Sequence, residues 1–120
     1  SCAQAFRQQA VAYLSRRLQD KGLGATTLAS HFGVSVRYVH CAFAQGGGCT
    51  VGDTLRRMRL ERCAEDLRNR LDQRPVSAIA ARWGFGDLPH FSKTFSAAYG
   101  SSPRQYRALQ ATVALDVQPP

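Results

Sequence analysis

The most constraining stretch of the sequence is residues 76–107, where apolar positions follow two short helical patterns separated by a break that contains glycine. Residues three or four positions apart lie on one face of an α-helix, so an amphipathic helix has apolar residues at that spacing. The spaced apolar residues are Ile79, Ala80 and Trp83 before the break, and Phe91, Phe95 and Tyr99 after it. The stretch therefore predicts two short amphipathic helices joined by a turn.

The break has the residues that a tight turn needs. Gly84 and Gly86 can adopt a positive φ without steric cost. Asp87 is a good helix N-cap, because its carboxylate accepts a hydrogen bond from a backbone amide of the first turn. Pro89 is tolerated in a first turn, where its missing N–H has no partner within the helix. The second helix of the pair is therefore expected to begin near Asp87.

A further helix follows this pair. Gly100 is expected to end the second helix, since glycine readily takes the left-handed conformation found after a helix C-terminus. Ser102 and Gln105 have the spacing of a capping box, and Pro103 occupies the first helical position between them. These residues predict a last short helix that continues through Tyr106.

An earlier part of the chain repeats the pattern. Residues 3–20 contain an apolar helical stripe, Gly33 is expected to end the next short helix, and Ser35 is the expected N-cap of the one after it. The two copies align at an offset of 51 residues, with one extra residue in the second turn. The matched pairs are Leu28 with Ile79, Ala29 with Ala80, Phe32 with Trp83, Gly33 with Gly84, Val39 with Phe91, Phe43 with Phe95, and Gly48 with Gly100. Internal repetition of this kind predicts two structurally similar subdomains.

Between the copies, residues 51–71 have the pattern of the longest helix. The apolar residues near one stripe are Leu55, Met58, Cys63, Leu67 and Leu71. About twenty residues at ~1.5 Å each form a rod of about 30 Å, close to the ~34 Å turn of B-DNA. We therefore expect an all-α fold, in which helix-turn-helix subdomains at residues 1–50 and 72–111 are joined by a linker helix at 51–71. Residues 112–120 end in two prolines and are expected to form a disordered tail.

The composition favours an anionic partner. Sixteen Lys and Arg residues against eight Asp and Glu give a net charge of +8, which is typical of nucleic-acid binding, although a basic surface that only maintains solubility would give the same balance. The four cysteines have neither a CxxC pair nor a histidine at zinc-ligand spacing, so we expect reduced thiols and neither metal nor cofactor. With no apolar run long enough for a membrane span and no signal-peptide pattern, a cytoplasmic protein without membrane contact is expected.

The sequence GFGDLPHFSKTFSAAYGSSPRQYR, with AIAARWGF overlapping its start, resembles the C-terminal signature of the AraC/XylS family of bacterial transcription regulators. The upstream stretch LASHFGVSVRYVHCAF resembles that family's first helix-turn-helix more loosely. The resemblance implies seven helices, with two helix-turn-helix motifs joined by a long helix. It also implies sequence-specific binding of double-stranded DNA at a promoter, with two recognition helices in successive major grooves and with RNA polymerase as a partner.

The resemblance, together with the chemistry of the side chains, indicates which residues meet the DNA. The expected base contacts are Val36, Arg37, His40 and Cys41 in the first copy, and Leu88 and Pro89 in the second. Arg37 is the main candidate, because a guanidinium can bond guanine O6 and N7 together. The expected phosphate contacts are Ser35, Ser92, Lys93 and Arg104. Any of these residues could instead be an exposed helix residue without a ligand.

The second copy leaves an alternative open. Leu88 and Pro89 supply no side-chain hydrogen-bond donor, so this copy could contact thymine methyl groups or mainly hold phosphates. Leu88 could also pack inward beside Phe91. His90 is expected to serve the helix start or the packing, because no second metal ligand lies at helical spacing from it.

Other classes of function have weaker support. A cysteine-dependent enzyme would need a histidine paired with Cys41 or Cys63, and the sequence shows no such pair, so no enzymatic activity is expected. An RNA-binding or thiol-based sensing module has no positive signal in the sequence. The family's usual N-terminal sensing domain has no counterpart in these 120 residues, so a small-molecule effector is expected only through such a domain.

Overall fold

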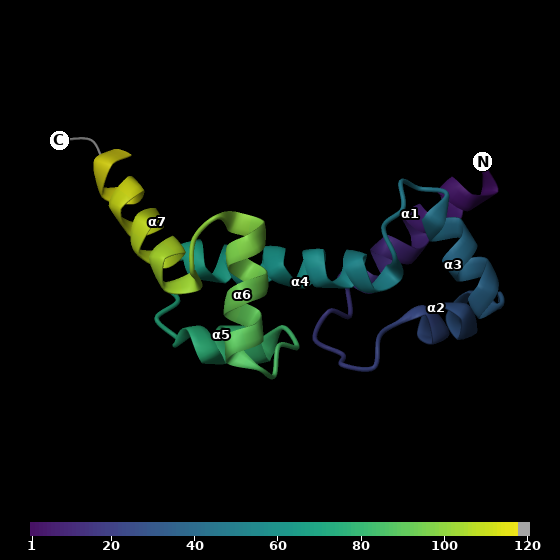
Figure 1. The fold of residues 1–120 in the computed structure, drawn as a ribbon, viewed down its shortest axis with the longest axis horizontal. Coiled ribbons are helices and arrows are strands. Elements are labelled where there is room, and N and C mark those ends of the chain that lie inside the picture. Colours follow the sequence, from purple (N-terminus) through teal and green to yellow (C-terminus); the bar gives the residue numbers. More distant parts are fainter. Residues whose placement is uncertain (118–120) are drawn as a thin grey trace. The chain divides into compact units, whose positions relative to one another are not determined.

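The computed structural model describes residues 1–117, and the side chains as far as residue 111. These residues form seven helices and no strand, which confirms the expected all-α class (Figure 1). The helices are α1 (Cys2–Ser15), α2 (Ala25–Phe32), α3 (Val36–Ala44), α4 (Val51–Arg68), α5 (Val76–Arg82), α6 (Leu88–Tyr99) and α7 (Pro103–Val117).

The chain divides into two compact units, Ser1–Arg59 and Leu60–Pro120. The division falls inside α4, whereas the sequence analysis assigned residues 51–71 to a separate linker. Each part of α4 packs into its own unit. Arg59 donates hydrogen bonds to the backbone carbonyls of Leu18 and Asp20 in the first unit, while Leu60 belongs to the core of the second.

Helix α4 is shorter than expected at its C-terminal end. It ends at Arg68, and Leu71, which the sequence placed on the buried stripe, is 91% exposed. The chain turns at Asn69, whose side-chain oxygen accepts a hydrogen bond from the Leu71 amide. Because this turn interrupts the helical register, Leu71 no longer follows Cys63 and Leu67 on the same face.

The core of the first unit lies among α1, α2 and α3. Helix α1 buries Ala3, Phe6, Ala10 and Leu14, which recur at the spacing of one helical face. This helix ends at Ser15, five residues before the expected end at Asp20, and the following turns still bury Leu18. Aromatic rings fill the space between the helices, since Phe6 meets both Phe32 and Tyr38 edge to face.

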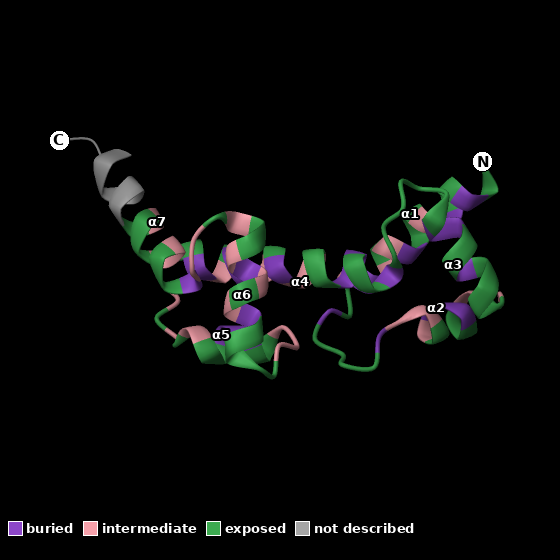
Figure 2. Cartoon of the chain, viewed as in Figure 1, coloured by how far each residue is buried: buried purple, intermediate pink, exposed green. Residues whose placement is uncertain are grey.

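The core of the second unit joins α4, α5 and α6. Phe91 and Phe95 are fully buried, which confirms them as core residues. Figure 2 shows buried positions on α4, α5 and α6. Trp83 is only half-buried at the edge of this cluster, and its indole Nε1 donates a hydrogen bond to Asp66 Oδ2 at 2.8 Å. Arg74 and Arg82 approach the same carboxylate at 3.3 and 3.7 Å. The Asp66 carboxylate therefore ties α4 to α5 and to the segment before it.

The last helix is longer than the sequence indicated. Helix α7 continues to Val117, whereas the sequence indicated a tail over residues 112–120. The remaining residues of the predicted tail, 118–120, lie outside the described part of the chain.

Substitution of Trp83 should separate its two contributions to stability. Trp83→Phe keeps an aromatic ring but removes the hydrogen bond to Asp66, so we expect a loss of about 1–2 kcal/mol in the free energy of unfolding. Trp83→Ala also removes the ring from the edge of the core and should cost about 3 kcal/mol or more. Urea unfolding followed by circular dichroism measures both values, and equal stability of the two variants would contradict this account.

Cys63 should differ from the other three cysteines in reactivity. Burial, and secondly the Asp66 charge, raise the pKa of its thiol to about 12, whereas Cys2, Cys41 and Cys49 are exposed. A thiol whose pKa rises on folding stabilises the fold below its unfolded pKa of about 8.5, and this contribution to the free energy of unfolding is lost as the pH climbs towards 12.

The burial of Cys63 can be tested by labelling. Iodoacetamide at about pH 8 should label three cysteines in the folded chain and the fourth, Cys63, only in denaturant. Four labels under native conditions would contradict the burial of Cys63.

Candidate nucleic-acid interface

Helix α3 is held with one face in the core of the first unit. Gly33, at φ 66°, ends α2 in the left-handed conformation, and Ser35 then caps α3 by accepting a hydrogen bond from the Tyr38 amide at 3.0 Å. Both features agree with the sequence analysis. The inward face consists of Val39, Ala42 and Phe43, which are all buried. This packing fixes which residues of α3 point outward.

The outward face of α3 contains the predicted base contacts of the first copy. Val36 is 39% exposed, and Arg37, His40 and Cys41 are exposed as well. Because successive residues advance by about 100° around a helix, these four positions share one side. Among the described side chains, none forms a hydrogen bond or ion pair with the Arg37 guanidinium. The structure therefore presents Arg37 and His40 together on an open surface.

Helix α6 has the expected start and end. Gly84, at φ 91°, makes the turn after α5, and Asp87 accepts a hydrogen bond from the His90 amide at 3.2 Å. Gly100, at φ 78°, ends the helix. Pro89 removes one amide from the first turn, and the Asp87 carboxylate adds a negative charge beside the remaining amides. The backbone at the start of α6 is therefore a poor site for a phosphate, so phosphate binding there depends on side chains.

The outward face of α6 is mostly apolar at its start. Leu88 is 41% exposed and Pro89 is exposed, so Leu88 does not join Phe91 in the core. Lys93 is exposed one turn further along, and Ser92 is half-buried. The predicted residues of the second copy thus lie near one another on α6, but only Lys93 and Ser92 offer hydrogen-bond donors.

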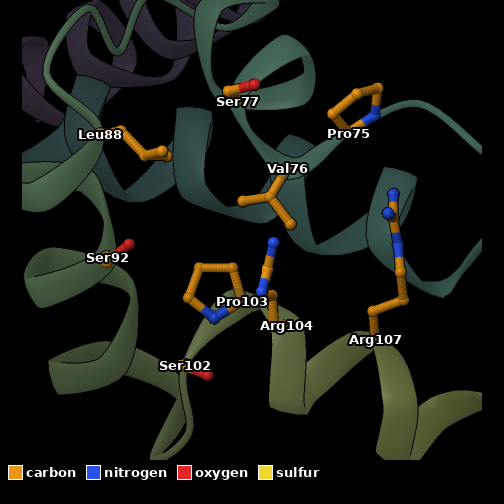
Figure 3. Close-up of a pocket in the computed structure, with 9 residues that line it drawn as sticks. All are labelled: Pro75, Val76, Ser77, Leu88, Ser92, Ser102, Pro103, Arg104 and Arg107. Atoms are coloured by element: carbon orange, nitrogen blue, oxygen red, sulfur yellow. The ribbon is translucent and has the colours of Figure 1, made fainter.

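A pocket of about 350 Å³ lies beside α6 in the second unit (Figure 3). It brings together three predicted contacts, Leu88 and Ser92 from α6 and Arg104 from the start of α7. The other lining residues are Pro75, Val76, Ser77, Ser102, Pro103 and Arg107. Two arginines and no acidic residue line it, so this pocket favours an anion. Lys93, the remaining predicted phosphate contact on α6, is not part of its lining.

Sequence reasoning missed Arg107 as a candidate. One of its terminal nitrogens is buried and has no hydrogen-bond partner among the described atoms, although buried donors are nearly always paired. The Arg107 charge also acts on Asp72, whose pKa is lowered to about 2, chiefly by the hydrogen bond from the Arg74 side chain. The signal was available, because Arg107 follows the predicted contact Arg104 by three residues, a spacing that places both side chains on one side of a helix.

The described residues contain neither a metal-binding cluster nor a membrane-spanning helix. No group of three or more His, Cys, Asp and Glu side chains is placed to hold a metal ion there. None of the helices in residues 1–117 is long and apolar enough to cross a membrane. The strongest site features are therefore the exposed face of α3 and the basic pocket beside α6.

Known proteins resemble this chain over most of its length. A family described as "Helix-turn-helix domain" matches residues 28–109. The F1 operon positive regulatory protein of Yersinia pestis is 28% identical over 99 residues, which are 82% of this chain and 32% of that protein. The transcriptional activator RhaS of Enterobacter sp. (strain 638) is 38% identical over 81 residues, which are 68% of this chain and 28% of RhaS. The chain thus spans about a third or less of the length of these relatives.

Solved structures resemble it as well. An AraC-type transcriptional regulator from Chromobacterium violaceum superimposes with a TM-score of 0.82 at 27% identity, covering 90% of this chain and 94% of that structure. The C-terminal domain of AraT, a response regulator from Geobacillus stearothermophilus, has a TM-score of 0.76 at 29% identity and covers 87% and 84%. With the helix-turn-helix match extending over more than half of the sequence, these similarities show that the chain belongs to the AraC/XylS family of helix-turn-helix transcription regulators.

Proposed function

We propose that this chain binds a specific sequence of double-stranded DNA, with α3 and α6 as its recognition helices. The observation that carries the proposal is the outward face of α3, where Arg37 and His40 are exposed and unpaired while the opposite face is locked in the core. A rigid helix with free donors on one side suits the major groove, where base edges present distinct patterns of donors and acceptors. The net charge of +8 supports binding to the phosphate backbone.

In this proposal the four residues of α3 have different roles. Arg37 donates two hydrogen bonds to guanine O6 and N7, and His40 supplies one further bond to a base edge. Val36 and Cys41 make apolar contacts, for which the thymine methyl group is the suitable partner. Ser35, already the helix cap, still has a hydroxyl hydrogen to donate to a phosphate.

The second unit mainly holds the DNA backbone in this proposal. Leu88 and Pro89 are limited to apolar contacts with bases, whereas Lys93, Ser92 and Arg104 can donate to phosphates. The anion-compatible lining of the pocket beside α6 supports this division, since it places Arg104 near Arg107 and Ser92. Affinity then comes from both units, and most base discrimination comes from the first.

We further propose that the chain is the non-enzymatic DNA-binding part of a cytoplasmic transcription activator. The relatives named above are described as a positive regulatory protein and a transcriptional activator, which suggests activation through RNA polymerase at a promoter. A small-molecule effector would act through a further domain of a longer protein.

The selection of duplexes from a random pool, followed by affinity measurements, tests the proposal. The chain should prefer the selected duplex over a scrambled duplex of equal length, and it should prefer either over single-stranded RNA. Affinity should also fall about forty- to 150-fold between ~50 and ~200 mM salt, as expected when three or four phosphates are neutralised. Equal affinity for selected and scrambled duplexes would contradict sequence-specific binding.

Two single substitutions should have different effects on sequence preference. Arg37→Ala should cost about 1–3 kcal/mol on the selected duplex and relax the preference at one base pair. Lys93→Ala should weaken selected and scrambled duplexes alike, because a phosphate contact carries no sequence information.

Arg70→Ala is a charge-matched control, since Arg70 is exposed and lies outside the proposed contacts. Titration of each variant with the selected duplex and with duplexes altered at single positions gives both quantities. If Lys93→Ala changed the base preference while Arg37→Ala did not, the proposed roles would be reversed.

A further inference from the structure

Arg7 reaches from α1 to the C-terminal end of α3. Its Nη1 donates a hydrogen bond of 2.6 Å to the backbone carbonyl of Ala42, a buried residue in the last turn of α3. The last carbonyls of a helix have no partner within the helix, and this end carries a partial negative charge. A guanidinium is therefore well suited to hold the end of this helix, and the Ser35 cap holds its start.

Gly46 provides the space that Arg7 occupies. A Cβ atom on Gly46 would overlap Arg7 Nε and lie 2.6 Å from Arg7 Cδ, which is too close for real atoms. The backbone of Gly46 does not require glycine, because its φ is not positive. Gly47 and Gly48 are the reverse case, with φ values of 108° and 85° and no atom within 4 Å of an added Cβ. Gly46 is therefore needed because a side chain there would collide with Arg7. Gly47 and Gly48 are needed because their backbones have a positive φ.

Phe6, the residue before Arg7, makes a second contact between α1 and α3. The buried ring of Phe6 meets Tyr38 edge to face, with 5.2 Å between the ring centroids. Phe6 and Arg7 are consecutive residues of α1. They contact α3 near its start, at Tyr38, and near its end, at Ala42. At about 100° per residue, Ala42 lies on the side of α3 opposite Arg37 and His40. The contact at Ala42 can therefore fix the orientation of the exposed face without touching a ligand on that face.

We propose that Arg7 is a positioning residue for base reading by α3, and that Gly46 lacks a side chain so that Arg7 can reach the end of this helix. The inference rests on the proposed function, since it assigns a role in sequence discrimination. Bidentate hydrogen bonding to a base tolerates only small displacements of the donor. Release of the last turn of α3 therefore weakens binding to the preferred sequence more than binding to phosphates, which tolerate a loose contact.

Two variants remove the contact in independent ways. Arg7→Gln deletes the guanidinium, whereas Gly46→Ala leaves the charge and displaces the arginine side chain. Each should lower the ratio of affinities for selected and scrambled duplex by about three- to tenfold, the range of a typical net hydrogen-bond contribution. The double variant should be no worse than the more affected single variant, because both changes break one interaction. Arg7→Lys should recover part of the ratio, since an ammonium can still donate to Ala42.

Arg16→Gln is the matched control, because it removes the same charge from an exposed position just after α1. An unchanged ratio in both Arg7→Gln and Gly46→Ala would overturn the proposal. It would also be overturned if Arg7→Gln weakened both duplexes equally and reduced the slope of log affinity against log salt by about one, which is the signature of a direct phosphate contact.

Hydrogen exchange of the α3 amides separates this inference from the proposed function. Faster exchange at the end of α3 in Gly46→Ala, with an unchanged circular dichroism spectrum, supports the positioning contact even if one variant of Arg7 fails to fold. Unaltered exchange there would overturn it. If the unmodified chain failed to discriminate between duplexes, sequence-specific binding would be contradicted. The exchange result would still decide whether Arg7 stabilises the end of α3.

Discussion

Short helices that are unstable alone form the whole candidate interface. Helix α3 has nine residues, and an isolated helix of this length is not stable in water. The free energy needed to form its first turn exceeds the free energy gained from so few hydrogen bonds. It exists here because Val39, Ala42 and Phe43 are buried against its neighbours. Burial on one side determines which side stays open, so the same contacts that stabilise α3 also select the residues available to a ligand.

Local features of the fold could be predicted from the sequence, and long-range contacts could not. Ser35, Asp87 and the Ser102–Gln105 capping box act within three residues of themselves, and all form the hydrogen bonds that the sequence indicated. The contact between Arg7 and Ala42 spans 35 residues. Nothing in the local sequence distinguishes Arg7 from Arg16 and Arg17 just after α1, because its partner is a backbone carbonyl.

In the candidate site, too, local features could be predicted from the sequence and long-range contacts could not. The exposure of Arg37 and His40 followed from the helical register, since the apolar positions fixed the opposite face. The pocket beside α6 did not follow, because it is built from three segments whose approach depends on the packing of Phe91 and Phe95. The chemistry of the side chains made Arg104 a candidate phosphate contact, and the three-dimensional structure added Arg107, which lines the same pocket.

Helix α4 is continuous across the division between the two units, and this has a consequence for how the chain melts. Because helix formation is cooperative along a segment, disorder that begins in one part of α4 removes hydrogen bonds from the adjoining turn of the other. Unfolding of the part of α4 in one unit therefore destabilises the part of α4 in the other unit. Heat or denaturant should act on a thermodynamically coupled pair, even though each unit has a hydrophobic core of its own.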